Sequence, residues 1–163
     1  MSGRVLARIP LAPATVHARN VTEPPAPSGD PITTILDRYR RVAVVGLSPK
    51  ISRPSYGVAA YLKARGYRVI AVNPNAELVF NEKCYAALED LPEPVDLVVI
   101  FRKPQFVPEI VSSAIRIGAR VIWMQEGVTH EPAARRARSA GLEVIQDRCI
   151  LKEHAKRFVS DGI

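Results

Sequence analysis

The stretch VVGLSPKISRPSYGVAAYLKARGYRVIAVNP, residues 44–74, reads as a buried strand, a loop, a helix and a second buried strand in immediate succession. This succession is the unit from which parallel sheets are built. The loop lacks the closely spaced glycines of the usual dinucleotide fingerprint, because ten residues separate Gly46 from Gly57. Hydroxyl and cationic side chains occupy the interval instead: Ser48, Lys50, Ser52, Arg53 and Ser55. This composition predicts a loop that binds an anion.

Short apolar runs alternate with helical segments along the rest of the chain. The runs are rich in Val and Ile and apolar on both faces, as in a parallel sheet whose two sides are covered by helices. The predicted strands are residues 41–46, 67–73, 95–101, 119–125 and 142–146. The predicted helices are residues 31–39, 56–65, 104–117, 132–140 and 149–159, with a weaker one at 85–91. We therefore expect an α/β fold over residues 32–160: a Rossmann-like, doubly wound, mainly parallel five-stranded sheet with helices on both faces.

The first 31 residues differ in composition from the rest. They hold six of the 14 prolines and show no sustained apolar period. Residues 1–31 are therefore predicted to form a flexible, Pro-rich N-terminal extension. Of the formal net charge of +7, this segment carries only +1. The positive excess belongs to the folded part and predicts anionic partners, but charge alone does not separate nucleic acid from phosphorylated small molecules or from acidic surfaces.

Composition disfavours several classes of protein. The chain has no run of about 18 apolar residues, so we expect no membrane partner. Its two cysteines, Cys84 and Cys149, form no CxxC pair and are accompanied by only three histidines. This disfavours a zinc site or a disulfide scaffold, and a reducing cytoplasmic location is expected.

In a sheet of this kind, ligands bind beyond the carboxyl ends of the strands, near the point where the strand order reverses. In the first loop there, Gly46 allows a ligand to approach the backbone. Arg53 can form a bidentate contact with phosphate beside the helix N-terminus that begins near Ser55. An ordinary surface loop rich in serine is the alternative.

Two further loops at this edge carry polar residues. Asn73-Pro74 occupies the place where NAD-binding folds usually have an acidic residue. A neutral amide tolerates a ribose that carries a phosphate, although a plain turn also explains the pair. Arg102 and Lys103 precede a helix that begins with proline, where a bound anion would offset their repulsion by the helix dipole. Two solvated side chains are the alternative.

The last two loops hold the candidate reactive groups. Glu126 is a single acid in a basic rim, and we expect it to orient polar groups rather than transfer protons. Thr129 or His130 is predicted to cap the helix that Pro132 opens, because no carboxylate–histidine–nucleophile arrangement can be proposed. Cys149 lies at the start of the last helix, where a thiol can become reactive. A half-buried cysteine that serves as a small apolar residue is the alternative.

These strand ends resemble a known family, the small stand-alone CoA-binding-domain proteins, which are similar to the amino-terminal domain of the succinyl-CoA synthetase alpha subunit. The resemblance covers about residues 32–158 and rests on the opening stretch, VDLVVIFRKP (95–104), WMQEGV (123–128) and DRC (147–149). It implies CoA as the cofactor. It implies that the pyrophosphate and adenosine lie in the loop of Gly46, Ser48, Ser52, Arg53, Ser55 and Tyr56, to which Lys50 adds charge. It also implies an adenosine edge at Asn73 and Pro74, and a rim facing the pantetheine arm at Phe101, Arg102, Lys103, Gln125, Glu126 and Gly127.

No residue matches the histidine that becomes phosphorylated in the ligase domain of the synthetase. The expected function is therefore a module that binds CoA or acyl-CoA, a small-molecule ligand, without an evident catalytic centre; the oligomeric state is left open. One alternative is an NAD(P)-binding Rossmann sensor or oxidoreductase-type protein, disfavoured by the missing acid at residue 73 and the missing glycine triplet. The other is a basic nucleic-acid binder, disfavoured by an aromatic content of 6% and the absence of a recognised signature.

Overall fold

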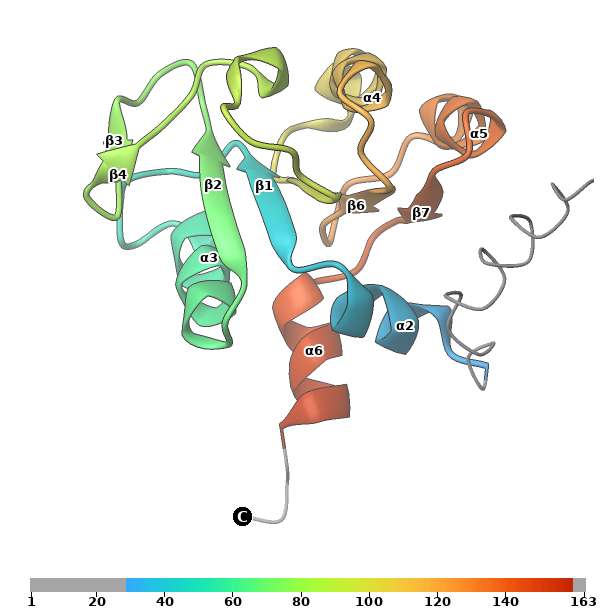
Figure 1. Ribbon diagram of the computed structural model, residues 1–163, viewed down its shortest axis with the longest axis horizontal. Helices are drawn as coiled ribbons and strands as arrows, with labels where there is room; N and C mark the ends of the chain where they lie inside the picture. Colours follow the sequence, from blue (N-terminus) through green and yellow to red (C-terminus); the bar gives the residue numbers. More distant parts are fainter. Residues whose placement is uncertain (1–28, 160–163) are drawn as a thin grey trace, which may run out of the picture. The chain divides into compact units, whose positions relative to one another are not determined.

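The computed structural model describes residues 29–159, which form a parallel five-stranded sheet with helices on both faces (Figure 1). The strand order is β2-β1-β5-β6-β7, and each neighbouring pair is parallel. The strands are β1 (Arg41–Val45), β2 (Arg68–Val72), β5 (Leu97–Ile100), β6 (Val121–Met124) and β7 (Glu143–Ile145). The predicted fold class and the five strand positions are confirmed. Of the predicted N-terminal extension, residues 1–28 lie outside the described residues.

Each face of the sheet is covered by its own group of helices (Figure 1). One face packs against α2 (Pro31–Arg38), α3 (Pro54–Ala64) and α6 (Ile150–Phe158), and the other against α4 (Val107–Arg116) and α5 (Glu131–Ser139). Successive side chains of a strand point to opposite faces. Val42 and Val44 of β1 therefore belong to the first core, and Ala43 and Val45 to the second. This explains why the strands are apolar throughout.

The strand order reverses beside β1. The chain passes from β1 through α3 to β2 on one side, and it returns to β5 on the other side. The register aligns Val45 with both Val72 and Ile100, so these three strands end at the same level. The helices that follow β1 and β5 pack on opposite faces, which places a crevice at the carboxyl ends of the two strands.

The segment at residues 85–91 contains no α-helix, so the prediction of a weak helix there is wrong. The N–H of Tyr85 donates to the carbonyl of Ala71 at 3.0 Å, and its carbonyl accepts from the N–H of Asn73 at 2.8 Å. Tyr85 thereby forms a parallel bridge with Val72 at the edge of the sheet. Leu88–Asp90 makes one 3-10 turn, η1, and before this segment β3 (Leu78–Val79) and β4 (Glu82–Lys83) form a small antiparallel hairpin. Pairing with the edge of β2 thus prevails over local helix propensity.

The start of α5 agrees with the sequence pattern. His130 is the N-cap residue, and its Nδ1 accepts a hydrogen bond from the N–H of Ala133 at 3.1 Å. The predicted capping role is therefore confirmed for His130. The helix after β5 begins with a 3-10 turn, η2 (Pro104–Phe106), that leads directly into α4. Within residues 29–159, no helix has the length and apolar character needed to cross a membrane.

Candidate functional site

A cavity of about 800 Å³ opens at the carboxyl ends of the strands. Residues 101–106, which follow β5, form one wall, and residues 125–128, which follow β6, form another. Pro54 and Val58 from the first turns of α3 and Cys149 from the start of α6 complete the lining. The volume falls in the range typical of small-molecule sites.

Gly46 brings the loop after β1 into direct contact with the end of β5. Its φ of +90° lies in the left-handed region. A Cβ atom at this position would lie 2.3 Å from the carbonyl oxygen of Phe101 and 3.1 Å from Cδ of Arg102. Only glycine fits there without a shift of the backbone. The loops after β1 and β5 therefore form a single continuous rim.

Two serines brace the loop between β1 and α3. The hydroxyl of Ser55, a buried residue, accepts from the N–H of Ser48 at 3.0 Å, and the hydroxyl of Ser48 accepts from the N–H of Lys50 at 3.0 Å. These hydroxyls were predicted as ligand donors, and in the structure they also order the loop. The N–H groups of Ser52 and Ser55 have no protein acceptor among residues 29–159. They remain available to an anion beside the N-terminus of α3.

Four cationic side chains surround this loop and the cavity. Lys50 and Arg53 lie on the loop after β1, and Arg102 and Lys103 follow β5. Among residues 29–159, none of the four has a carboxylate partner within 4.0 Å. The guanidinium of Arg102 instead lies over the ring of Phe106, 4.0 Å from its centroid. The rim therefore carries positive charge that no carboxylate of the described part of the chain neutralises by direct pairing.

Asn73 joins the loop after β2 to the loop after β1. Its Nδ2 donates to the carbonyl of Leu47 at 3.0 Å, and its Oδ1 accepts from the N–H of Asn75 at 2.9 Å. Both ends of the amide thus have protein partners. The predicted contact of Asn73 with adenosine stays a prediction.

Tyr56 packs away from the cavity wall. Its ring lies 4.4 Å from the ring of Phe80, centroid to centroid, in the hairpin region. Pro74 lines a second, smaller cavity of about 350 Å³ beside the ends of β1 and β2, and Arg102 lines both cavities. The roles predicted for Tyr56 and Pro74 in adenosine binding stay predictions.

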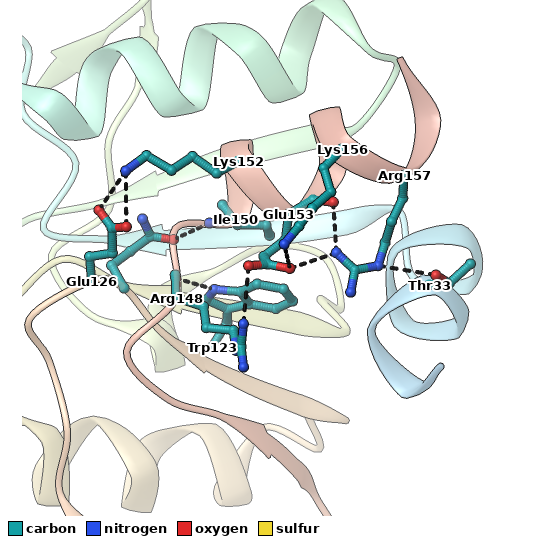
Figure 2. Close-up of polar contacts among 10 residues, drawn as sticks. Thr33, Trp123, Glu126, Arg148, Ile150, Lys152, Glu153, Lys156 and Arg157 are labelled. Carbon is teal, nitrogen blue, oxygen red and sulfur yellow. Dashed lines mark hydrogen bonds and ion pairs between the residues drawn. The ribbon is translucent and has the colours of Figure 1, made fainter. Parts of the chain in front are cut away.

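Hydrogen bonds with two buried residues, Trp123 and Gln125, hold the backbone on either side of Cys149, and Figure 2 shows the first of them, between Trp123 and Arg148. Nε1 of Trp123 donates to the carbonyl of Arg148 at 2.8 Å. Oε1 of Gln125, a residue with 4% of its surface exposed, accepts from the N–H of Ile150 at 3.0 Å. Trp123 belongs to β6, and Gln125 is the first residue after this strand. The two hydrogen bonds therefore fix the start of α6 against the sheet.

The carboxylate of Glu153 holds the next turn of α6 (Figure 2). It is buried and accepts from Arg157 at 2.6 Å and from Arg148 at 3.3 Å. Burial raises the pKa of Glu153, but the hydrogen bonds from Arg157 and Arg148, together with the positive charges of Lys156 and Arg157, outweigh burial, so the pKa is lower than usual. The carboxylate therefore stays ionised and ties the residue before Cys149 to α6.

The remaining rim residues are also paired. Both oxygens of Glu126 accept from Nζ of Lys152, at 3.2 and 3.0 Å, and this hydrogen bond raises the pKa of Lys152. The N–H of Gly127 donates to Oδ1 of Asp147 at 2.7 Å. Glu126 is thus held in an exposed ion pair with Lys152, and its expected role in orienting polar groups stays a prediction.

The structure brings six of the predicted site residues together in the larger cavity: Phe101, Arg102, Lys103, Gln125, Glu126 and Gly127. The sequence reasoning missed much of the apolar lining, namely Pro54, Val58, Pro104, Phe106 and Val128. Phe106 could have been found, because it lies in the first turn after a strand-end loop. Val58 could not, because it follows the same apolar pattern as the core residues of α3.

Comparison with known proteins connects this site to a family. A family model described as a CoA binding domain matches residues 40–155. YneT, an uncharacterized protein of Bacillus subtilis (strain 168), is 35% identical over 129 residues, which are 79% of this chain and 96% of YneT. The ADP-forming acetate–CoA ligase II of Archaeoglobus fulgidus is 31% identical over 83 residues, which are 50% of this chain and 12% of the ligase. The solved structure of a hypothetical protein from Pyrococcus horikoshii OT3 is 40% identical and has a TM-score of 0.75, covering 77% of this chain and 88% of that chain.

Proposed function

The chain belongs to the CoA-binding domain family, and from this premise we propose that it is a module that binds CoA or an acyl-CoA at the carboxyl ends of β1, β5 and β6. The phosphates bind to the loop after β1, and the pantetheine arm enters the cavity that leads to Cys149. In this proposal the chain binds and orients the ligand and has no catalytic role of its own.

The observation that carries this proposal is the pairing of an unneutralised cationic loop with an apolar cavity. Lys50 and Arg53 have no carboxylate partner among residues 29–159, and the N–H groups of Ser52 and Ser55 are free beside them. Free N–H groups at a helix N-terminus, together with arginine, are a typical phosphate site. CoA carries two anionic groups, a pyrophosphate and a 3′-phosphate, and a long, largely uncharged pantetheine arm. The cavity beside the loop suits this arm.

NADP is the second candidate, because the residue after β2 is the neutral Asn73 rather than an acid. A ribose phosphate would be tolerated there. However, the side-chain amide of Asn73 is already engaged with Leu47 and Asn75. The loop after β1 also lacks the glycine triplet on which a dinucleotide pyrophosphate usually lies. CoA therefore remains the preferred ligand.

Thermal unfolding with and without ligand tests the proposal. Purified protein is heated with CoA, acetyl-CoA, NADP, NAD or a DNA duplex under reducing conditions. A ligand present at about 100 times its Kd adds roughly 2.7 kcal/mol to the free energy of unfolding, which corresponds to about 5–10 °C for a domain of this size. We expect a shift with CoA or acetyl-CoA. A shift with NADP and none with the two CoA compounds would reject the proposal.

The substitution Arg53→Glu locates the phosphates. The side chain of Arg53 is exposed and has no ion pair among the described residues, so its replacement should change the stability of the unliganded protein by less than about 0.5 kcal/mol. We expect the Kd for CoA, measured by calorimetry, to rise at least about 10-fold, because a bidentate phosphate contact is replaced by repulsion. Arg135→Glu, at an exposed position on α5, makes the same change in net charge and is the control. Equal losses in the two variants would show that net charge, and not this loop, determines affinity.

A further inference from the structure

The larger cavity is lined by one cysteine, Cys149, at the start of α6. Cys149 is a free, half-buried cysteine that lines the same cavity as Pro54 and Val58 of α3. A ligand that is held by the loop after β1 and fills this cavity would contact the lining that includes Cys149. The thiol of CoA lies at the end of its pantetheine arm, so the two sulfurs would meet.

The backbone on both sides of this thiol is anchored by the fold. The carbonyl of Arg148 is held by Trp123, and the N–H of Ile150 is held by Gln125, so the residues on both sides of Cys149 are anchored to buried side chains (Figure 2). Arg148 is further bound to the buried carboxylate of Glu153. A group held in place in this way loses little conformational freedom when it reacts.

Gln125 gives a second, independent indication of a ligand at this end of the cavity. Its side chain lines the cavity, and the residue is 4% exposed. Oε1 is bound to Ile150, but Nε2 has no acceptor among residues 29–159. Buried donors without an acceptor are rare in proteins. Nε2 is therefore available to an acceptor outside the described residues, such as an amide carbonyl of a pantetheine arm.

From these observations we propose that Cys149 captures CoA covalently by thiol–disulfide exchange with a CoA disulfide. This inference rests on the proposed CoA site. The thiolate of Cys149 attacks one sulfur of the disulfide, the S–S bond breaks, and one CoA leaves as its thiolate, which takes up a proton. The product is a mixed disulfide between Cys149 and the other CoA. The electrons balance without an added oxidant, and a second thiol reverses the reaction.

Cys84 provides an internal control for this reaction. It is 6% exposed, and its thiol donates to the carbonyl of Asn73 at 3.5 Å. Burial shields the sulfur of Cys84 from a disulfide in solution, and it also raises the pKa of Cys84. The thiolate is the reacting form in disulfide exchange. Only Cys149 should therefore be modified in the folded protein.

Mass spectrometry of the intact protein tests the proposal. Reduced protein, freed of reductant, is mixed with CoA disulfide or with glutathione disulfide at the same concentration, and the mixed disulfide is followed over time. We expect modification of wild type and of Cys84→Ser but not of Cys149→Ser. We also expect reaction with CoA disulfide to be at least about 10-fold faster than with glutathione disulfide, because binding aligns the reacting sulfurs. In Arg53→Glu, the ratio of the two rates should fall to about one.

Three results would overturn the inference: modification of Cys149→Ser, absence of a CoA adduct on wild type, or equal rates with the two disulfides. Calorimetry of wild type with reduced CoA in the presence of a phosphine reductant separates this inference from the proposed function. Binding there without adduct formation from CoA disulfide would reject only the reaction at Cys149. Absence of binding there would reject the CoA site itself.

Discussion

Replacing Gly46 by alanine tests the close contact on which the site is built. A residue with a side chain at φ +90° costs about 1–2 kcal/mol in the folded state. At Gly46 a second cost is added, because the new Cβ would lie 2.3 Å from the carbonyl oxygen of Phe101, where Cβ atoms essentially never approach closer than 3.0 Å. Relieving such an overlap requires the backbone to move and costs about 1–3 kcal/mol. The lower entropy of the unfolded chain offsets up to about 1 kcal/mol of this sum, so we expect Gly46→Ala to lower the free energy of unfolding by about 2–4 kcal/mol.

Gly66 is the matched control for this substitution. Its φ is +92°, almost equal to that of Gly46, but a Cβ there meets nothing within 4 Å. Gly66→Ala should therefore lose only the conformational part, about 1 kcal/mol after the reduced entropy of the unfolded chain is counted. Urea unfolding followed by far-ultraviolet circular dichroism gives both values from the same type of measurement.

The difference in unfolding free energy between Gly46→Ala and Gly66→Ala measures the cost of the contact with the end of β5. We expect Gly46→Ala to be less stable than Gly66→Ala by about 1–3 kcal/mol, since only the first substitution pushes the loop after β1 away from β5. The same displacement should weaken CoA binding in Gly46→Ala and leave it unaltered in Gly66→Ala. Equal losses of stability would refute the reasoning, because they would mean that the contact with the end of β5 can relax at no cost.

Two further substitutions test interactions outside the cavity. The hydroxyl of Tyr67 donates to the buried carbonyl of Leu36 at 2.6 Å, so Tyr67→Phe should lower the free energy of unfolding in urea by about 1–3 kcal/mol. The hydroxyl of Tyr85 has no hydrogen-bond partner among residues 29–159, so the control Tyr85→Phe should lower it by less than about 0.5 kcal/mol. Similar losses in the two variants would contradict this reasoning. Burial lowers the pKa of His154 below its usual 6.5, so the unfolded chain binds the proton more readily and stability should fall as the pH drops from 6.5 toward the folded-state pKa. His154→Gln keeps a side chain that can hydrogen-bond the hydroxyl of Tyr61, which lies 2.9 Å from Nδ1 in the wild type, and should flatten this dependence between about pH 8 and pH 5. An unchanged slope would assign the pH dependence to other groups.

The sheet could be predicted from sequence because its strands are buried on both faces. In β1, Val42 and Val44 enter one core and Ala43 and Val45 enter the other, so the run is continuously apolar and cannot be mistaken for a half-exposed strand. The start of a helix could also be predicted where a single capping residue determines it, as His130 does for α5. The cavity lies where topology predicts a ligand, at the carboxyl ends of the strands beside the reversal of strand order.

The roles of individual site residues were less accessible, because they depend on contacts between loops. Nothing in the local sequence shows that the amide of Asn73 binds the carbonyl of Leu47, or that the hydroxyl of Ser55 accepts from Ser48. The wrong prediction of a helix at residues 85–91 has the same cause, a contact between segments that are distant in the sequence. Its propensity is local, but the edge of β2 offers hydrogen bonds to Tyr85 that no window of neighbouring residues contains.

The single tryptophan of the chain gives the protein an intrinsic optical signal at the start of α6. The indole of Trp123 is fully buried, and its N–H is bound to the carbonyl that precedes Cys149. The emission of a buried indole responds to small changes in the polarity and hydrogen bonding around it. Entry of a molecule into the cavity, or formation of a bond at the neighbouring sulfur, should therefore be visible as a change in fluorescence in real time and without a dye.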